Sequence, residues 1–167
     1  MDLEDLAAIE AVKQCKYRYL RCLDTKDWAG MAEVLAPGCT ASYGGGAYAF
    51  DGRDAILAFL ERTMGSTEVV SSHRVHHPEI ELDADRCGAE ARWALDDTVL
   101  LLAFDLTVRG SAYYQDRYER DDDGAWHIVH TGYKRLFEEI QPRGPVEGLS
   151  VTAHWWDTDG RSTLPAV

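Results

Sequence analysis

Residues 91–99 read Ala-Arg-Trp-Ala-Leu-Asp-Asp-Thr-Val, and the interpretation of the whole chain starts from them. Side chains of one parity are mostly apolar, which predicts a β-strand with one buried face. Asp97 shares that parity with Trp93, so its carboxylate is expected on the apolar face. A carboxylate in such a place is unfavourable unless it is paired. An imidazole is the natural partner, and a core arginine such as Arg92 or Arg135 is the alternative.

The preceding stretch, residues 72–82, reads Ser-His-Arg-Val-His-His-Pro-Glu-Ile-Glu-Leu and contains three of the six histidines. It is interpreted as the start of another strand. A histidine beside an aspartate in an apolar pocket is the basic equipment for acid–base chemistry near neutral pH, and His73 is the leading candidate. His76 and His77 are weaker candidates, because Pro78 disrupts the strand pairing beside them. The spacing H-x-x-H-H does not place a standard set of metal ligands on one face, so no metal is expected.

Outward from these two strands, helical patterns come first and strand patterns follow, which predicts an α+β fold. The apolar periodicity predicts helices at 3–24, 27–35 and 54–64 and a hairpin at 39–50. Alternation predicts strands at about 68–82, 87–100, 104–120 and 125–138. We expect one domain over 1–141. The extension 142–167 has no clear period, but Trp155 and Trp156 favour its packing on the domain or on a neighbouring subunit.

Charge and composition exclude several classes of protein. The formal net charge of −12 argues against binding to nucleic acid or to an anionic membrane, since both need a basic surface. No apolar run approaches the roughly 20 residues of a membrane span. The first five residues are acidic, where a secretory signal would be basic, and the four cysteines form no C-x-x-C pair. These features predict a cytoplasmic protein.

Two residues of the first helix attract attention. Tyr19 lies near the middle of the apolar stripe, and a buried phenol usually finds a hydrogen-bond partner, so it is either a core residue or a catalytic donor. Asp24 lies in the last turn, where a negative charge opposes the helix dipole. The helical wheel separates Asp24 from Tyr19, so a shared pocket requires the helix to end or bend there.

The later strands offer further polar candidates. Asp116 shares its parity with Tyr114, so it is expected to point inward. It is either a residue of the functional site or a member of a structural ion pair. His127 and His130 have opposite parities, so one of them faces inward, and periodicity does not say which.

Several motifs resemble the SnoaL-like branch of the nuclear transport factor 2-like superfamily over about residues 5–140. They are Tyr19-x4-Asp24-x2-Asp27-Trp28, Ser72-His73, Pro78-Glu79-Ile80-Glu81-Leu82, Trp93-Ala94-Leu95-Asp96-Asp97, Ala112 through Tyr118, and Trp126 through Leu136. The resemblance implies a cone, in which a curved antiparallel sheet and three N-terminal helices enclose a pocket. The branch includes bile-acid dehydratases and a hexachlorocyclohexane dehydrochlorinase, and scytalone dehydratase is a relative.

The resemblance also implies a chemistry. These lyases use no metal or organic cofactor; a histidine oriented by an aspartate removes a proton, and tyrosines or other donors assist the leaving group. By motif, the catalytic set corresponds to Tyr19, Asp24, His73, Asp97 and Arg135. We add as candidate substrate contacts His76, Trp93, Tyr114, Asp116 and His130.

We therefore expect a cofactor-independent lyase, a dehydratase or related elimination enzyme, that acts on a hydrophobic cyclic small molecule. A polyketide cyclase or isomerase with the same pocket is the first alternative. A non-catalytic small-molecule-binding or oligomerisation module is the second, because one fold can carry many functions. A homo-oligomer, either a dimer or a trimer, is expected, with the outer face of the sheet as the contact surface.

Overall fold

The first helix, α1, spans Leu3–Thr25 in the computed structural model, which describes residues 1–165. Asp2 caps its N-terminus by accepting from the Asp5 backbone N–H, while the Asp5 side chain accepts from the Asp2 N–H. This reciprocal arrangement satisfies two backbone donors that would otherwise lack a partner. At the other end, Lys26 adopts a left-handed conformation with φ of 57° and ends the helix one residue after Asp24, at Thr25.

A helix–hairpin–helix segment follows. Helix α2 spans Trp28–Val34, strands β1 and β2 span Leu35–Tyr43 and Tyr48–Asp51, and helix α3 spans Arg53–Met64. The β1–β2 connection contains a short 3₁₀ turn at Gly44–Gly46, whose three glycines all have positive φ. The predicted helices and hairpin are confirmed, and β1 begins earlier than the sequence indicated.

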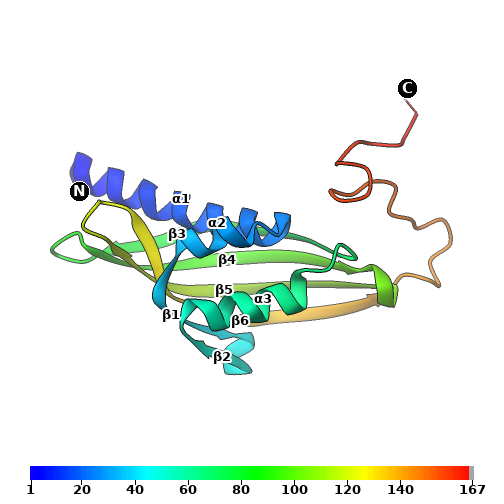
Figure 1. Ribbon diagram of the computed structural model, residues 1–167, viewed down its shortest axis with the longest axis horizontal. Coiled ribbons are helices and arrows are strands. Elements are labelled where there is room, and N and C mark those ends of the chain that lie inside the picture. The colour runs from blue at the N-terminus through cyan, green and yellow to red at the C-terminus, as the bar shows by residue number, and fades with distance from the viewer. Residues whose placement is uncertain (166–167) are drawn as a thin grey trace.

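Four long strands complete the sheet: β3 at Val69–Leu82, β4 at Gly88–Leu101, β5 at Leu106–Arg120 and β6 at Trp126–Pro142. A 3₁₀ turn at Leu102–Phe104 joins β4 to β5. The strand order is β2-β1-β6-β5-β4-β3, and the sheet is curved and not closed (Figure 1). The expected α+β fold with three helices and a curved sheet is confirmed.

One pairing differs from the expected antiparallel sheet. Strand β1 runs parallel to β6, with Thr40 opposite His130 and Ser42 opposite Gly132, so the sheet is mixed. The reason is topological: β1 reaches the sheet after two helices rather than through a hairpin with its neighbour, so no tight turn requires the two strands to be antiparallel.

A β-bulge breaks the β3–β4 register between His76 and Glu79. His77 has φ of 28°, outside the conformation that ordinary side chains prefer, and Pro78 cannot donate a backbone hydrogen bond. Bulges bend a strand and increase its local twist. The disruption that the sequence indicated at Pro78 is therefore present, and it separates the half of β3 that contains His73 from the half that contains the glutamates.

All three helices lie on one side of the sheet, over its concave face (Figure 1). Along β4 the inward side chains become less buried from Trp93, with no exposed surface, through Asp97 at 6%, to half-buried Val99. On β6, Thr131 is fully buried and Ile140 is 62% exposed. The core therefore occupies one end of the concave face, and the other end opens; we call the open end the mouth.

Beyond Pro142 the described part of the extension has neither helix nor strand. Arg143 ties its start to the domain by donating to the Asp105 carbonyl at 2.8 Å, and further along the ring centroid of Trp156 lies 4.3 Å from the ammonium group of Lys26. Lys26 also donates to the backbone carbonyls of Met64 and Val69, at 2.5 and 2.8 Å. One lysine thus connects the end of α1, the end of α3, the start of β3 and the extension. Among the described residues, no helix is both long and apolar enough to cross a membrane.

Candidate functional site

A histidine–aspartate pair lies between the filled core and the mouth. His73 Nδ1 donates to Asp24 Oδ1 across 2.7 Å, and the His73 backbone N–H donates to Asp24 Oδ2 across 2.8 Å. The hydroxyl of Ser71 donates to Oδ1 of the same carboxylate at 2.8 Å. We expected Asp97 or Asp24 to lie within hydrogen-bonding reach of His73 in one cavity; the distance is confirmed for Asp24, and the shared cavity stays a prediction.

The end of α1 explains how Asp24 reaches this position. Asp24 comes two residues before Lys26, at which the helix stops, so its side chain can cross to β3 although it lies well away from Tyr19 on the helical wheel. Burial alone would raise the pKa of the Asp24 carboxyl, but the hydrogen bonds from His73 and Ser71 outweigh burial and hold the pKa below its usual value. The carboxylate is thus ionised near neutral pH and orients the ring.

The orientation leaves the second ring nitrogen available. With Nδ1–H bound to Asp24, the neutral imidazole has its lone pair on Nε2. Within residues 1–165, we find no hydrogen bond from another group to Nε2. The His73 side chain is 9% exposed and that of Asp24 is 21% exposed, so the pair is sheltered and still within reach of a small molecule. This is the arrangement of an oriented general base.

A second charged group lies beside the first. Asp97 is directly opposite His73 in the β3–β4 register, so the two side chains are neighbours on the concave face. Arg135 donates to both carboxylate oxygens of Asp97 through its two terminal nitrogens, and Nη2 lies 2.9 Å from Oδ2. Its Nε lies 3.2 Å from Glu138 Oε2. The alternative that Asp97 pairs with a core arginine therefore holds, and Asp97 makes no hydrogen bond to His73 that we find in residues 1–165. We call Asp24, His73, Asp97, Arg135 and Glu138 the mouth cluster.

Gly110 on β5 makes room for this arginine. A Cβ atom at Gly110 would lie 2.5 Å from Arg135 Nη1 and 2.9 Å from the Phe137 carbonyl oxygen, closer than real side-chain contacts. The guanidinium can therefore lie flat across β5 and reach Asp97 on the next strand only because this residue has no side chain.

A second polar group lies deeper, in the filled end of the cone. Lys16 has no exposed surface, and its Nζ lies 2.7 Å from Asp116 Oδ2 and 3.3 Å from the centroid of the Tyr114 ring. Tyr118 and Thr131 donate to the two oxygens of Asp116, at 2.9 and 2.8 Å. Burial lowers the pKa of Lys16, and the neighbouring Asp116 opposes that shift. We call Lys16, Tyr114, Asp116, Tyr118 and Thr131 the deep cluster.

Aromatic rings connect the two clusters. Tyr19 is fully buried, and its hydroxyl shares a 2.8 Å hydrogen bond with that of Tyr43. Tyr43 packs against Phe59 and against Tyr133, with ring centroids 6.1 and 5.8 Å apart. The guanidinium carbon of Arg135 lies 5.0 Å from the Tyr133 ring centroid. Burial raises the pKa of Tyr19 well above its usual value, so this phenol stays protonated.

The remaining predicted substrate contacts divide between the two faces of the sheet. Trp93, Tyr114 and Asp116 are buried in the filled end of the concave face. His76 lies on the outer face with its Nε2 3.5 Å from Asp96 Oδ2, and His130 lies there too, with its Nδ1 2.7 Å from the Thr40 hydroxyl. The structure therefore does not bring His76 or His130 to the mouth cluster.

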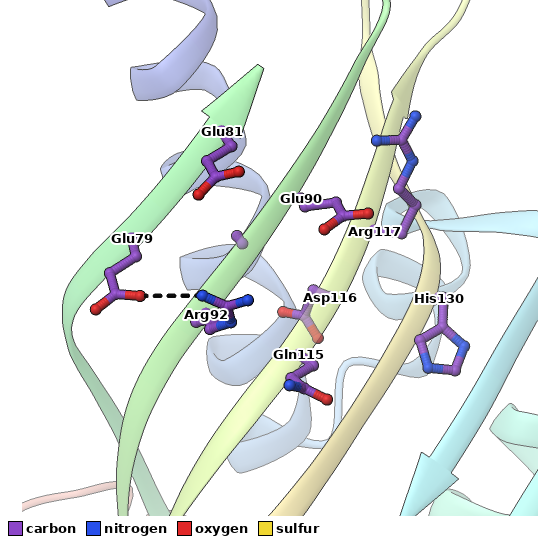
Figure 2. Close-up of a pocket in the computed structure, with 9 residues that line it drawn as sticks. Glu79, Glu81, Glu90, Arg92, Gln115, Asp116, Arg117 and His130 are labelled. Atoms are coloured by element: carbon purple, nitrogen blue, oxygen red, sulfur yellow. Dashed lines mark hydrogen bonds and ion pairs between the residues drawn. The ribbon is translucent and has the colours of Figure 1, made fainter. Parts of the chain in front are cut away.

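Figure 2 shows a hollow of about 280 Å³ on the outer face, with α1 behind the strands. Its polar lining consists of Glu79, Glu81, Glu90, Arg92, Gln115, Asp116, Arg117 and His130. Arg92 lies 3.5 Å from Glu79 across the β3–β4 pair. The hollow is mixed in charge and faces away from His73.

Sequence reasoning missed several residues of these clusters. Lys16 lies four residues after buried Val12 and three before buried Tyr19, and a lysine within an apolar stripe was a usable signal. Ser71 and Glu138 carried no signal, since their functions depend on the end of α1 and on the register of β6. Within residues 1–165, no three Cys, His, Asp or Glu side chains form a group that could hold a metal ion.

This arrangement defines a class: an α+β protein whose curved sheet and three helices position an oriented histidine at an opening. The chain belongs to the SnoaL-like domain family, whose model matches residues 4–132. The described fold and the family agree over about three-quarters of the sequence.

Solved structures share this fold. A hexachlorocyclohexane dehydrochlorinase from Novosphingobium barchaimii LL02 superposes with a TM-score of 0.76 at 15% identity, covering 92% of this chain and 100% of that one. A candidate scytalone dehydratase from Novosphingobium aromaticivorans superposes with a TM-score of 0.73 at 19% identity, and the match covers 81% of this chain and 88% of that one. An NTF2-like protein of unknown function from Pseudomonas putida superposes with a TM-score of 0.64 at 19% identity, and the match covers 79% of this chain and 89% of that one. At these identities the likeness supports the fold alone.

Proposed function

We propose that this protein is a cofactor-independent lyase that eliminates a leaving group from a hydrophobic cyclic small molecule, with His73 as the general base. The observation that carries the proposal is the 2.7 Å bond between His73 Nδ1 and Asp24, with Nε2 left without a protein partner among the described residues. Similar folds named as a dehydrochlorinase and a candidate scytalone dehydratase support the reaction class.

The elimination balances without an added reagent. His73 Nε2 takes a proton from a carbon next to the carbon that bears the leaving group. The electrons of the broken C–H bond form the new double bond, and the leaving group departs with the electrons of its own bond. The imidazolium that forms is stabilised by ionised Asp24. A hydroxyl leaving group also needs a proton, and half-buried Tyr133 is the phenol nearest Arg135.

Tyr19 takes a supporting part in this proposal. It is fully buried behind Tyr43, so we assign it the task of positioning Tyr43 and, through it, the Tyr133 ring. The aromatic rings of Tyr43, Phe50, Phe59 and Tyr133 supply the apolar surface that a cyclic substrate would contact.

The test is turnover of a panel of cyclic compounds, each with an acidic C–H beside a carbon that bears hydroxyl or chloride, followed by product analysis. We expect an unsaturated product from the wild type and a rate lower by roughly 10²–10⁴-fold for His73→Gln. His76→Gln, a matched histidine on the outer face, should leave the rate unchanged. Equal rates for both variants would refute His73 as the base. A cyclised or isomerised product would move the reaction to the first alternative.

A non-catalytic binding module is the second candidate, and one observation favours it. Four hollows on the surface are lined by other residues, and neither His73 nor Asp24 lines any of these four. If the panel binds at the mouth in titrations and no compound is turned over, this candidate replaces the lyase.

Assembly and location belong to the same proposal. We propose a homo-oligomer, a dimer in the first instance, formed through the outer face, where Tyr113 is 46% exposed among charges of both signs. Light scattering that finds only an 18.7 kDa species at micromolar concentration would refute it. The four free cysteines suit a reducing compartment, so we propose the cytoplasm.

We further propose that the extension 142–167 covers the mouth. Trp156 is its visible attachment, beside Lys26 and two residues from Asp24 in the α1 sequence. Residues 166–167 lie outside the described part of the chain.

A further inference from the structure

Among the described residues, the cationic side chains that we find beside the mouth already bind other groups of the protein. Arg135 is held by Asp97 through both terminal nitrogens and by Glu138 at its Nε. Lys26 donates to two backbone carbonyls and lies against the Trp156 ring. The two terminal nitrogens of Arg135 and the ammonium group of Lys26 thus already have partners in the protein, and Arg135 Nε is buried beside Glu138 without a hydrogen bond. Lys16, the third cation of the concave side, is fully buried on Asp116.

The acidic groups of the same region outnumber these cations. Asp97 and Glu138 contact Arg135, and Asp24 contacts His73. Glu138 is the most exposed of the three acids, with its side chain 50% exposed. An anion that approached Arg135 would meet Glu138 first. It would also have to displace a carboxylate from a two-bond contact that protein geometry already satisfies.

Arg135 cannot easily turn towards a ligand instead. Its guanidinium lies across Gly110, where a Cβ would be 2.5 Å from Nη1, and its carbon lies over the Tyr133 ring. The pocket left by the glycine and the ring fixes the plane of the guanidinium, and Asp97 fixes its direction. Arg135, which the resemblance placed in the catalytic set, therefore binds the protein's own carboxylates.

We propose that Asp97 and Glu138 act as specificity-determining residues, which keep Arg135 from binding anions and restrict the site to uncharged substrates. The inference deepens the proposed function and rests on its placement of the site at the mouth. Selection here works by rejection: a ligand carboxylate would meet like charge, and it would find both terminal nitrogens of Arg135 already bound to Asp97. Removal of the two carboxylates should convert Arg135 into an anion-binding group.

Binding of two probes tests this without any need for turnover. 2-Naphthol is neutral and 2-naphthoate is anionic at pH 7, and they share one ring system. We expect the wild type to bind the naphthol at least about tenfold more tightly in fluorescence titrations. Asp97→Asn/Glu138→Gln should bind the naphthoate roughly 10–100-fold more tightly than the wild type does, the value of a charge-assisted hydrogen bond.

The control removes the same two charges from the opposite face. Asp96→Asn/Glu139→Gln changes the adjacent residues, whose side chains are exposed on the outer face, and it should leave both affinities unchanged. An equal gain in naphthoate binding in this control would mean that net charge alone matters, which would overturn the inference. If Asp97→Asn/Glu138→Gln does not fold, Glu138→Gln alone should still raise naphthoate affinity, since Glu138 is half exposed.

NMR signals of His73 separate failure of this inference from failure of the proposed site. Naphthol binding that shifts the His73 ring signals, with wild-type naphthoate binding as tight as naphthol, would overturn the charge selection and leave the site in place. If the His73 signals do not move, whether or not a probe binds elsewhere on the protein, the proposed site is refuted and this inference with it.

Discussion

The deep cluster and the mouth cluster are built from the same kinds of residue and differ in what remains unsatisfied. In the deep cluster, Asp116 pairs with Lys16 and accepts hydrogen bonds from Tyr118 and Thr131, and the side chains of Asp116 and Lys16 have no exposed surface. In the mouth cluster, Asp24 is also saturated, but it holds a histidine whose second nitrogen has no protein partner among residues 1–165. A carboxylate whose hydrogen bonds are satisfied can therefore do one of two things. It stabilises the fold when its partner is fully buried, and it orients a base when part of its partner remains accessible.

Replacement of the orienting acid should have the largest effect. Asp24→Asn removes the charge that stabilises the imidazolium and lets the amide present its NH₂ to Nδ1, which favours the wrong tautomer. We expect turnover to fall by roughly 10²-fold or more, with the protein still folded at 25 °C. Steady-state kinetics beside circular dichroism checks this. Turnover within threefold of the wild type would remove Asp24 from the site.

The same kind of change in the deep cluster should act on stability instead. Lys16→Met leaves Asp116 as a buried charge without its cation, which typically costs about 3–5 kcal/mol in the free energy of unfolding. Urea denaturation measures it. Lys16→Met/Asp116→Asn removes both charges and should recover part of the loss. A Lys16→Met protein as stable as the wild type would mean that the ion pair contributes nothing.

Acid should weaken the mouth cluster in a defined pH range. The pKa of Asp24 is lower in the folded chain than in the unfolded one, so its contribution to stability is complete above about pH 4 and is lost as the pH falls through the folded value. Asp24→Asn should therefore cost about 1–3 kcal/mol at pH 7 and less at pH 3. Denaturation curves at both pH values would show it. A difference that stays constant with pH would contradict the ionised carboxylate.

The smallest expected effect is at the extension. Trp156→Ala removes one cation–π contact to Lys26, worth about 0.5–1 kcal/mol at an exposed site. If the extension covers the mouth, 2-naphthol should bind more weakly and dissociate faster, while the melting temperature changes little. Trp155→Ala, at a neighbouring and 61% exposed ring, is the matched control. Equal effects of the two variants would argue against a specific cover.

The sequence predicted the fold better than it predicted the contacts of the site. Alternation and helical stripes depend on local spacing, so the three helices and the four long strands were predictable from them. The pairing of β1 with β6 was not, because nothing in residues 35–43 specifies a partner 90 positions away. The parallel direction follows from the path of the whole chain.

Within the site, the contact of His73 with an aspartate was predicted, but both Asp24 and Asp97 remained open. Parity placed Asp97 on the buried face, which is correct, yet Arg135 pairs with Asp97 and Asp24 pairs with the imidazole. That choice depends on the left-handed turn at Lys26, on the missing Cβ of Gly110 and on the register of β6. None of these is a property of the residues that meet.

The parallel β1–β6 pair has a consequence for how the chain reaches its native state. Strand β1 cannot find its partner until residues 126–142 exist, so the sheet is completed by a contact between distant parts of the chain, which makes folding slow relative to local hairpin closure. During synthesis, β1 and β2 must wait as an unpaired edge while α3, β3, β4 and β5 emerge. A ribosome stalled before β6 would therefore present two open edges to other chains, and the nascent protein would depend on chaperones until the last strand is released.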